Sequence, residues 1–274
     1  MPTIITQGAA SARGFGFAGG PKGPPLPITA SNYVGTINEW AYRGITFDRI
    51  SGYWLYTQQQ ASTETIYRMS LTTSGTVTNQ SSFTMTSPGP GIRGLAVHPT
   101  QNYIYSCSYG NPYLFIGNYS GGLSTVNLSQ TGGSVITGSG WGLTYNSDQD
   151  RLVVGEFQIG PNAYWNNISS NPTPSTNSGT ITFYKNTGSI IDVCGLAYDS
   201  DANVYYVSTY NGGNNIWVCN PDGSSYGPPI QIPGSPSVDT GIGALGYYNG
   251  ILLAQPDEND RTPSNPLRMF YRAV

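Results

Sequence analysis

The 274-residue chain offers few side chains that could carry out chemistry. Its one histidine, His98, is followed by Pro99 and lies where a strand-like segment gives way to a turn. Because a single histidine without a recognisable nucleophile or acid motif is a weak catalytic signal, we interpret His98 as a turn residue. The sequence has no Gly-x-Ser-x-Gly elbow, no His-Glu-x-x-His and no phosphate-binding loop. We therefore predict that the protein is not an enzyme and has no catalytic residues and no cofactor.

Carboxylates and amides gather in short polar turns, where they offer oxygen atoms at alternate positions. Two such turns are Asn146 to Asp150 and Asp199 to Asn203. Hard cations such as calcium prefer oxygen ligands, but the turns lack the glycine and the distant glutamate of a calcium loop. Hydrogen bonds from the side chain to the backbone also explain Asp and Asn at tight turns. The acidic loop with Asp257, Glu258 and Asp260 is more typical of a solvated segment. We predict no metal site.

The three cysteines do not resemble a disulfide framework. Cys107, Cys194 and Cys219 are odd in number, widely separated and flanked by strand-like residues. Free cysteines are among the most buried residue types, so we expect these three to be small hydrophobic core residues.

Aromatic side chains are a more promising resource for binding. Tyr164 and Trp165 lie in a polar segment, residues 160–179, which we expect to be an inserted loop. Together with Asn166 and Asn167 they offer flat apolar surface beside amide donors and acceptors, which suits sugar rings or a protein surface. Packing of the two rings onto the scaffold is an equal alternative.

A second candidate site comes from positions that are equivalent in a sequence repeat. Arg43, Arg93 and Trp141 each stand directly before the first glycine of a repeated motif. They could line a channel entrance that binds a small ligand, or the two arginines could only donate hydrogen bonds to backbone carbonyls.

The composition restricts the partners and the fold class. Charged residues make up 9% of the chain, whereas an ordinary globular domain has about 25%. With a net charge of -3 and no cluster of Lys and Arg, the chain is not expected to bind nucleic acid or an anionic membrane surface. It has no apolar run long enough to span a bilayer and no apolar core of a signal peptide near its start. The abundance of Gly, Pro and Tyr favours an all-β fold.

A short sequence motif occurs five times in the chain, at intervals of about 50 residues. Each copy has a glycine, an apolar residue, a small residue, an apolar or aromatic residue and usually a polar turn residue. The copies are Gly44 to Asp48, Gly94 to His98, Gly142 to Asn146, Gly195 to Asp199 and, more weakly, Gly243 to Tyr247.

Further strand-like segments follow each motif, which gives units of about four strands, as in propeller blades. We expect third strands at residues 66–71, 113–118, 180–185, 216–220 and 267–272, and fourth strands at 82–86, 123–127 and 229–232. The last unit supplies only three strands, and the segment Asn32 to Ile37 would complete it and cover its open edge. We predict a five-bladed β-propeller over residues 32–274, closed by an N-terminal strand; a β-sandwich and a β-solenoid are the alternatives.

Residues 1–31 form an extended arm of a different kind. Ten of the twenty residues from Gly8 to Pro27 are Gly or Pro, so this segment cannot build its own core. Phe15 and Phe17, beside Arg13, would leave two rings in water unless another protein covers them. We predict that these three residues attach the arm to a partner; a disordered terminus without a role is the alternative.

Two parts of the sequence resemble known families. Asn215 to Ser224, after the run Val204 to Val207, resembles the YWTD and NHL-type propeller repeats, which implies architecture and not function. Ile4 to Phe17 resembles the start of many tail-associated proteins of bacteriophages. This second resemblance implies a virion structural protein, assembled in the host cytoplasm, whose arm joins the particle.

Strand directions in a propeller place the arm and the C-terminus on the face with the tight first turns, and longer connections on the other face. We therefore expect a tail fibre or adhesin, anchored by its arm to other virion proteins within a homo-oligomeric or symmetric assembly. The opposite face would bind a host-surface glycan or protein. The alternatives are a capsid decoration or head-fibre protein, a carbohydrate-binding propeller outside any virus, and a propeller hydrolase or lactonase with an axial metal.

Overall fold

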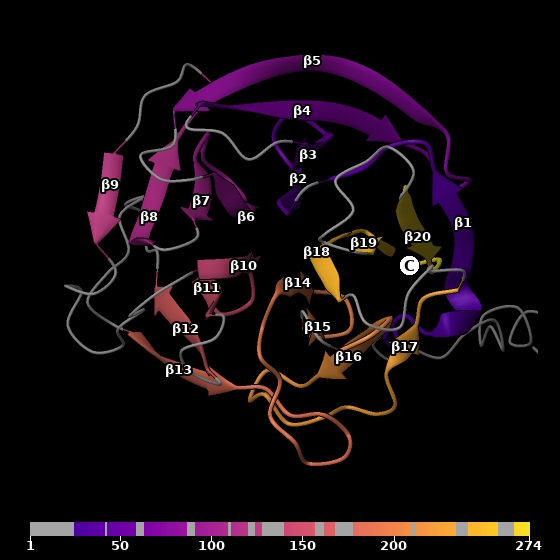
Figure 1. The fold of residues 1–274 in the computed structure, drawn as a ribbon. Coiled ribbons are helices and arrows are strands. Elements are labelled where there is room, and N and C mark those ends of the chain that lie inside the picture. The colour runs from indigo at the N-terminus through magenta and orange to yellow at the C-terminus, as the bar shows by residue number, and fades with distance from the viewer. Residues whose placement is uncertain are drawn as a thin grey trace, which may run out of the picture.

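The computed structural model describes residues 25–41, 43–58, 63–86, 91–108, 111–119, 124–127, 140–156, 162–167, 178–209, 212–233, 241–256 and 266–274. These residues form five sheets of four antiparallel strands, arranged as blades around a central axis (Figure 1). The all-β, five-bladed propeller predicted from the repeat is confirmed.

Each of the first four blades is built from strands that follow one another in the chain. Blade 1 consists of β2 (Ile45–Asp48), β3 (Tyr53–Thr57), β4 (Thr63–Leu71) and β5 (Val77–Thr86). Blade 2 consists of β6 (Ile92–Val97), β7 (Ile104–Ser108), β8 (Asn111–Gly117) and β9 (Ser124–Asn127). Blade 3 consists of β10 (Gly140–Asn146), β11 (Arg151–Glu156), β12 (Asn162–Asn167) and β13 (Ser178–Thr182). Blade 4 consists of β14 (Gly195–Asp199), β15 (Val204–Ser208), β16 (Asn215–Cys219) and β17 (Ile230–Gln231).

Blade 5 joins the two ends of the chain. It contains β18 (Ile242–Tyr248), β19 (Ile251–Pro256) and β20 (Leu267–Tyr271), and its outer strand is β1 (Tyr33–Ile37), which follows the short 3-10 helix η1 (Ala30–Asn32). β1 pairs antiparallel with β20, from Tyr33 opposite Phe270 to Ile37 opposite Leu267. The closing strand is therefore where the sequence placed it.

The glycine of the motif is explained by close packing between neighbouring inner strands. A Cβ atom at Gly44 would lie 2.7 Å from Cγ of Leu95, and one at Gly94 would lie 2.6 Å from Cβ of Leu143. Each glycine thus makes room for the leucine of the next blade. In blade 5 the register places Ala244 opposite Gln255, just as Gly195 lies opposite Ser208, so this copy begins one residue later than predicted.

The hydrophobic core is divided among the junctions between blades. Five larger clusters of buried residues each combine side chains from two neighbouring blades. Tyrosines contribute to them, since Tyr56, Tyr105, Tyr205 and Tyr206 are at most 1% exposed. The interpretation of many tyrosines as fillers between blades is confirmed for these four.

Blade 3 differs from the prediction. Residues 160–179 are not one inserted loop, because Asn162–Asn167 form the third strand β12 and Ser178–Thr182 form the fourth strand β13. Thr180 to Lys185, predicted as the third strand, instead begins within the fourth. β12 escaped recognition because its sequence, NAYWNN, lacks the regular alternation of apolar and polar residues that marks a half-buried strand.

Both ends of the described chain lie on the face with the tight first turns. Tyr271, near the C-terminus, pairs with Ile251, the first residue after the tight turn of blade 5, and Tyr33 pairs with Phe270. This confirms the orientation deduced from strand directions. Arg13, Phe15 and Phe17 lie outside the described residues. Within the described part of the chain, no helix has the length and hydropathy to cross a membrane.

Candidate functional site

The predicted trio of Arg43, Arg93 and Trp141 meets at the end of the axis opposite the tight turns. The guanidinium carbon of Arg43 lies 4.1 Å from the centre of the Trp141 ring, and that of Arg93 lies 5.1 Å away. Cys194, at the equivalent position of blade 4, lies 4.0 Å from a guanidinium nitrogen of Arg43. Equivalent positions of the repeat are thus brought together at one end of the axis.

The trio is buried and does not line an open entrance. Arg43, Arg93 and Trp141 are 6%, 5% and 4% exposed. An indole held by two guanidinium groups is a strong packing arrangement when it is shielded from water. A ligand-binding role for these residues stays a prediction.

A layer of apolar side chains closes the middle of the axis. Ile45, Leu95, Leu143, Leu196 and Leu245 are all 3% exposed or less, and the space between them does not admit a water molecule. The two ends of the axis are thus separate, and no described channel runs through the propeller.

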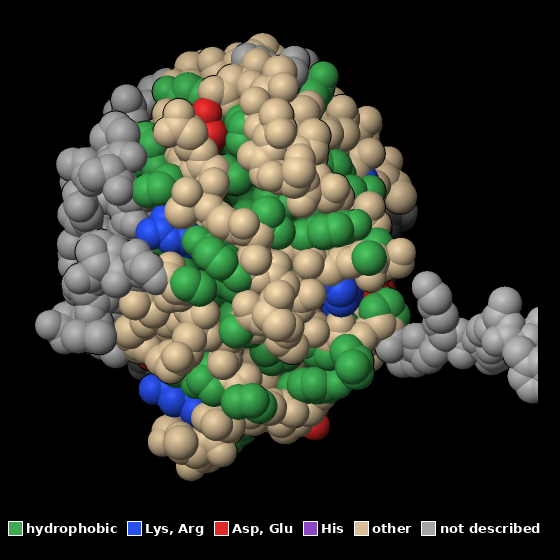
Figure 2. All heavy atoms as spheres, turned by 90° about the vertical axis from the view of Figure 1, so that its right-hand side faces the viewer, with side chains coloured by type: hydrophobic (Ala, Val, Ile, Leu, Met, Phe, Trp, Pro, Cys, Tyr) green, Lys and Arg blue, Asp and Glu red, His purple; other side chains and the backbone are tan. Residues whose placement is uncertain are grey.

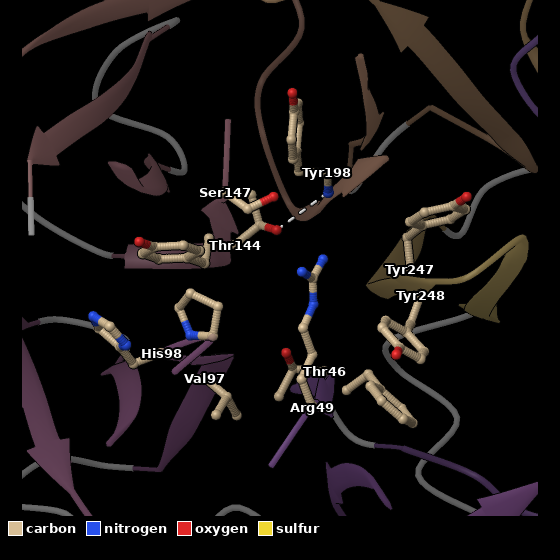
Figure 3. Close-up of a pocket in the computed structure, with 12 residues that line it drawn as sticks. Thr46, Arg49, Val97, His98, Thr144, Ser147, Tyr198, Tyr247 and Tyr248 are labelled. Atoms are coloured by element: carbon tan, nitrogen blue, oxygen red, sulfur yellow. Dashed lines mark hydrogen bonds between the residues drawn. The ribbon is translucent and has the colours of Figure 1, made fainter. Parts of the chain in front are cut away.

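The tight-turn end of the axis carries a small open pocket of about 50 Å³, here called the axial pocket (Figure 3). It is formed where the inner strands of all five blades end. Its lining consists of Thr46, Phe47, Arg49, Val97, His98, Pro99, Thr144, Tyr145, Ser147, Tyr198, Tyr247 and Tyr248.

Arg49 gives the axial pocket its positive charge. Its guanidinium points into the middle of the pocket, towards Thr144 (Figure 3). The side chain is exposed, and its guanidinium carbon lies 5.5 Å from the centre of the Tyr248 ring. Among the described residues, no partner forms a hydrogen bond or ion pair with Arg49. Its donors are therefore available to an acceptor group that enters the pocket.

Aromatic rings surround this guanidinium and are held in fixed orientations. Phe47 and Tyr248 stack face to face, with ring centres 3.7 Å apart and an angle of 8° between the planes. The Tyr198 hydroxyl donates to Asp148 at 2.7 Å, and the Tyr247 hydroxyl donates to Asp201 at 2.6 Å. The Tyr145 hydroxyl donates to Asp150 in the same way. The aspartates thus orient the tyrosines.

The acidities of these tyrosines, Tyr145 included, are also strongly perturbed. Burial and the hydrogen bond to Asp148 raise the pKa of Tyr198, and burial with the charge of Asp199 raises the pKa of Tyr247. Both hydroxyls therefore stay protonated near neutral pH and act as donors rather than as bases.

His98 fills the same role as the acidic residues of the other turns. Its Nδ1 accepts hydrogen bonds from the backbone N–H groups of Thr100 and Gln101, at 3.3 and 3.1 Å. Asp199 Oδ1 accepts from the N–H groups of Asp201 and Ala202 at 3.0 and 2.9 Å. Burial lowers the pKa of His98, which favours the neutral ring that can accept. The interpretation of His98 as a turn residue is confirmed.

The side-chain oxygens of the other turns are likewise occupied by local hydrogen bonds. Asp48 accepts from the backbone N–H groups of Ile50 and Ser51, and Asn146 Oδ1 accepts from those of Asp148 and Gln149. Within the described residues, no group of three His, Cys, Asp or Glu side chains could hold a metal ion. The loop with Asp257, Glu258 and Asp260 lies outside the description.

Tyr164 and Trp165 are half-buried parts of strand β12 rather than tips of a loop. The Tyr164 hydroxyl donates to Glu156, and burial together with this hydrogen bond raises the tyrosine pKa to about 12. The Trp165 indole lies beneath the guanidinium of Arg151, at 3.7 Å, and covers Gly179 on the next strand. These contacts favour the packing alternative. A binding role for the pair with Asn166 and Asn167 stays a prediction.

The cysteines are free and buried, as expected. Burial raises the pKa of Cys107, Cys194 and Cys219 to about 12 in each case, so none is a ready nucleophile.

Sequence reasoning missed the axial pocket, although the motif contained a signal for it. Phe47, Tyr145, Tyr198 and Tyr247 precede the turn residue in four blades and converge on the axis. The sequence alone favours an interpretation of the tyrosines as fillers between blades. Arg49, one residue after the motif of blade 1, carried no recognisable signal.

Comparison with known proteins supports the fold and no narrower assignment. No family model and no curated protein matches the sequence. The glutaminyl cyclase of Myxococcus xanthus has a similar structure, with a TM-score of 0.55 and 14% identity over 86% of this chain and 91% of that one. A chain in the crystal structure of a nidogen/laminin complex gives a TM-score of 0.46 and 12% identity, covering 88% of this chain and 81% of that one. At this identity, the likeness to the glutaminyl cyclase indicates the propeller fold alone. Neither name concerns a virion or a bacteriophage.

Proposed function

We propose that the protein is a non-enzymatic binding propeller of a bacteriophage virion, in which the axial pocket binds a terminal sugar of a host-surface glycan. The observation that carries the binding part is the exposed Arg49 guanidinium, which points into a pocket walled by fixed aromatic rings (Figure 3). Aromatic faces pack against the apolar side of a sugar, and a guanidinium donates several hydrogen bonds to its oxygen atoms.

The size and chemistry of the axial pocket favour the end of a glycan over a whole small molecule. Ligand pockets for drug-sized molecules usually enclose about 300 to 1,000 Å³, whereas the axial pocket has about 50 Å³. The hydroxyls of Thr46 and Ser147 add short polar groups to its lining. One edge of a sugar would enter, and the rest of the glycan would extend over the tight-turn face.

The virion part of the proposal is supported by the resemblance of Ile4 to Phe17 to the start of phage tail-associated proteins. The base of the arm is firmly attached to the propeller. The buried Ile28 donates its backbone N–H to the Tyr206 hydroxyl at 2.7 Å, and Arg272 donates to the carbonyl of Leu26. A load on the arm would therefore be passed to blades 4 and 5, as an anchoring segment requires.

The proposal moves the binding surface to the face that also carries the arm. The sequence instead predicts binding by long loops on the opposite face, and the segments that lie there are largely outside the described residues. The described base of the arm, residues 25–31, does not contribute to the axial pocket. The described base of the arm lies beside the outer strand β1 at the rim (Figure 1), so attachment and binding are compatible on one face.

The non-enzymatic part rests on the state of the reactive groups. His98 accepts two backbone hydrogen bonds, and the three cysteines are buried with raised pKa values. The shared fold with a glutaminyl cyclase makes a direct assay worthwhile. We expect no turnover above the uncatalysed rate with glutaminyl peptides or lactones, with or without added divalent metal; turnover that depends on the protein would overturn this part.

Glycan binding is tested with the full chain on an array of bacterial surface glycans, followed by titration calorimetry with the best ligand. Tyr248→Ala removes the ring stacked on Phe47 and should weaken binding at least about tenfold, since stacked aromatic contacts and buried area are lost. Tyr184→Ala is the matched control, because Tyr184 is 39% exposed and does not line the pocket. Equal loss in both variants, or no glycan bound by the wild type, would contradict the proposal.

Attachment is tested separately, in the phage that encodes the protein. If the phage encodes the chain without residues 1–24, the purified particles should lack this protein. If the phage encodes the Tyr248→Ala variant, the purified particles should contain it. Retention of the truncated chain would contradict an anchoring role for the arm.

A further inference from the structure

A large apolar hollow lies at the base of the arm. This arm-base groove encloses about 440 Å³, and one wall is the arm itself, from Leu26 to Ser31. The other wall is made by blade 4, through Val218 and the segment Tyr226 to Ile230, which contains Pro228 and Pro229. None of the residues that line it is charged.

The groove is open and its rim is apolar. Leu26 is 73% exposed and Tyr226 is 47% exposed, and these are among the most exposed large hydrophobic side chains of the described residues. Hydrophobic side chains gather beside the place where the described chain begins (Figure 2). Exposed apolar surface of this kind usually marks a place where another segment packs.

Both walls are fixed before anything binds. The arm wall is held by the hydrogen bonds from Ile28 to Tyr206 and from Arg272 to Leu26. Arg272 also forms an ion pair with Asp199 at 3.1 Å, and Asp199 accepts a hydrogen bond from Tyr206 at 2.8 Å. On the blade wall, Tyr226 donates its backbone N–H to Val218 at 2.8 Å. A preformed groove loses little conformational entropy when it is filled.

We propose that this groove binds the phenylalanine rings of the same chain's arm, Phe15 and Phe17. The N-terminal segment that the structure does not describe, residues 1–24, is joined to Pro25. Pro25 precedes Leu26, the first residue of the arm wall, so this segment is attached at the groove. Phe15 and Phe17 are its only aromatic residues, and an uncharged apolar groove matches their chemistry. Burial of the two rings would explain why a Gly- and Pro-rich arm carries them.

The sequence between the rings and the groove allows the chain to turn back. The segment Ala18 to Pro25 contains Gly19-Gly20-Pro21 and Gly23-Pro24, which are typical of turns. Its eight residues could span at most about 29 Å when extended, which keeps the rings near the groove. A short flexible connection gives an effective concentration in the millimolar range, so the chain's own arm outcompetes a second copy in dilute solution.

Binding of the rings in the arm-base groove gives the arm two alternative positions. In the free protein the rings lie on blade 4, and a virion partner that takes up the same rings must compete with the groove. This inference does not depend on glycan binding at the axial pocket.

Disulfide trapping in the full chain tests the proposal. Phe17→Cys combined with Tyr226→Cys should form a disulfide within one chain under mild oxidation, seen as a faster monomer band on non-reducing gels. Phe17→Cys with Ile50→Cys is the control, because Ile50 is 51% exposed on a turn of blade 1 and does not line the groove. The native cysteines are buried and do not compete. A dimer band would mean that the groove binds the arm of a second copy. Equal disulfide formation in both pairs would mean that the rings do not prefer the groove. Either result overturns the proposal.

Limited proteolysis gives a second measurement without engineered cysteines. Trypsin sites at Arg13 and Lys22 flank the rings, and cleavage tracks the fraction of molecules with the arm released. If the groove is occupied in nine of ten molecules, replacing both rings by alanine should speed cleavage about tenfold, and Tyr226→Ala should have a similar effect. Unchanged cleavage rates in both variants, with unfolding temperatures equal to the wild type, would overturn the proposal.

Discussion

The two ends of the propeller axis are built from equivalent strands and differ in what they leave exposed. At the end opposite the tight turns, Arg43 and Arg93 are buried against Trp141. At the tight-turn end, Arg49 is exposed above the axial pocket and has no described ion pair. The same residue type therefore serves packing at one end and is available for binding at the other.

The difference follows from register rather than from composition. Positions before the first motif glycine point into the crowded ring of inner strands, where two guanidinium groups must share one indole. Arg49 lies after its strand has ended, in the tight turn, where the backbone is no longer enclosed by neighbouring blades. Substitutions at the two ends can therefore test whether the buried arginines act in packing and the exposed arginine acts in binding.

Trp141→Ala should have the largest effect. The substitution removes an indole that is 4% exposed and leaves two guanidinium groups around a cavity. Truncation of a buried tryptophan costs about 3 to 5 kcal/mol of unfolding free energy. Denaturant unfolding followed by tyrosine and tryptophan fluorescence measures the loss. If the Trp141 end is open rather than packed, the variant would lose less than about 1 kcal/mol.

Gly94→Ala should have the next largest effect, because its new methyl group would press on the apolar layer that separates the two ends of the axis. Its new Cβ would lie 2.6 Å from Cβ of Leu143 and 2.9 Å from Sγ of Cys107. Overpacking of this kind costs about 1 to 3 kcal/mol. Gly227→Ala is the control, since a Cβ there meets nothing within 4 Å. Equal unfolding midpoints for the two variants would contradict the packing explanation of the motif.

The architecture could be predicted from the sequence because its causes are local and repeated. In blades 1 to 4 a glycine before the apolar inner residue is needed for contact between blades, and Asp48, Asn146 and Asp199 all cap a tight turn by the same backbone hydrogen bonds. His98 could be assigned to a turn for the same reason, because its place in the repeat outweighs its chemistry.

The failures concern residues whose environment comes from distant parts of the chain. Tyr164 and Trp165 look like loop residues because the asparagines around them hide a strand. Their packing is shown by the contacts of Trp165 with Arg151 and Gly179 and by the hydrogen bond from Tyr164 to Glu156. The axial pocket collects one to three residues from each blade, so Arg49 and Tyr248 meet only after the ring has closed.

Arg43→Ala and Arg49→Ala form a matched pair with opposite expected effects. Arg43→Ala loses a shielded cation–π contact and should cost about 1 to 2 kcal/mol of stability without changing glycan affinity. Arg49→Ala should change stability by less than about 0.5 kcal/mol and weaken glycan binding about tenfold or more, since hydrogen bonds to a charged donor are lost. Thermal unfolding and calorimetric titration of both variants decide the matter, and a common loss of affinity would erase the distinction between the two ends.

His98→Asn should have the smallest effect and separates turn chemistry from charge at the rim of the axial pocket. Burial lowers the pKa of folded His98 below its ordinary value of 6.5, so between these two values the unfolded chain binds more protons than the folded chain. Stability of the wild type should therefore be complete above about pH 6.5 and fall as the pH drops through this window. Asparagine keeps the turn, as Asn146 does in blade 3, but cannot be protonated. Urea midpoints at pH 7.5 and pH 5.0 should consequently differ less in the variant than in the wild type, since the other titrating groups are shared. The same pH dependence in both proteins would mean that His98 is not held neutral by the turn.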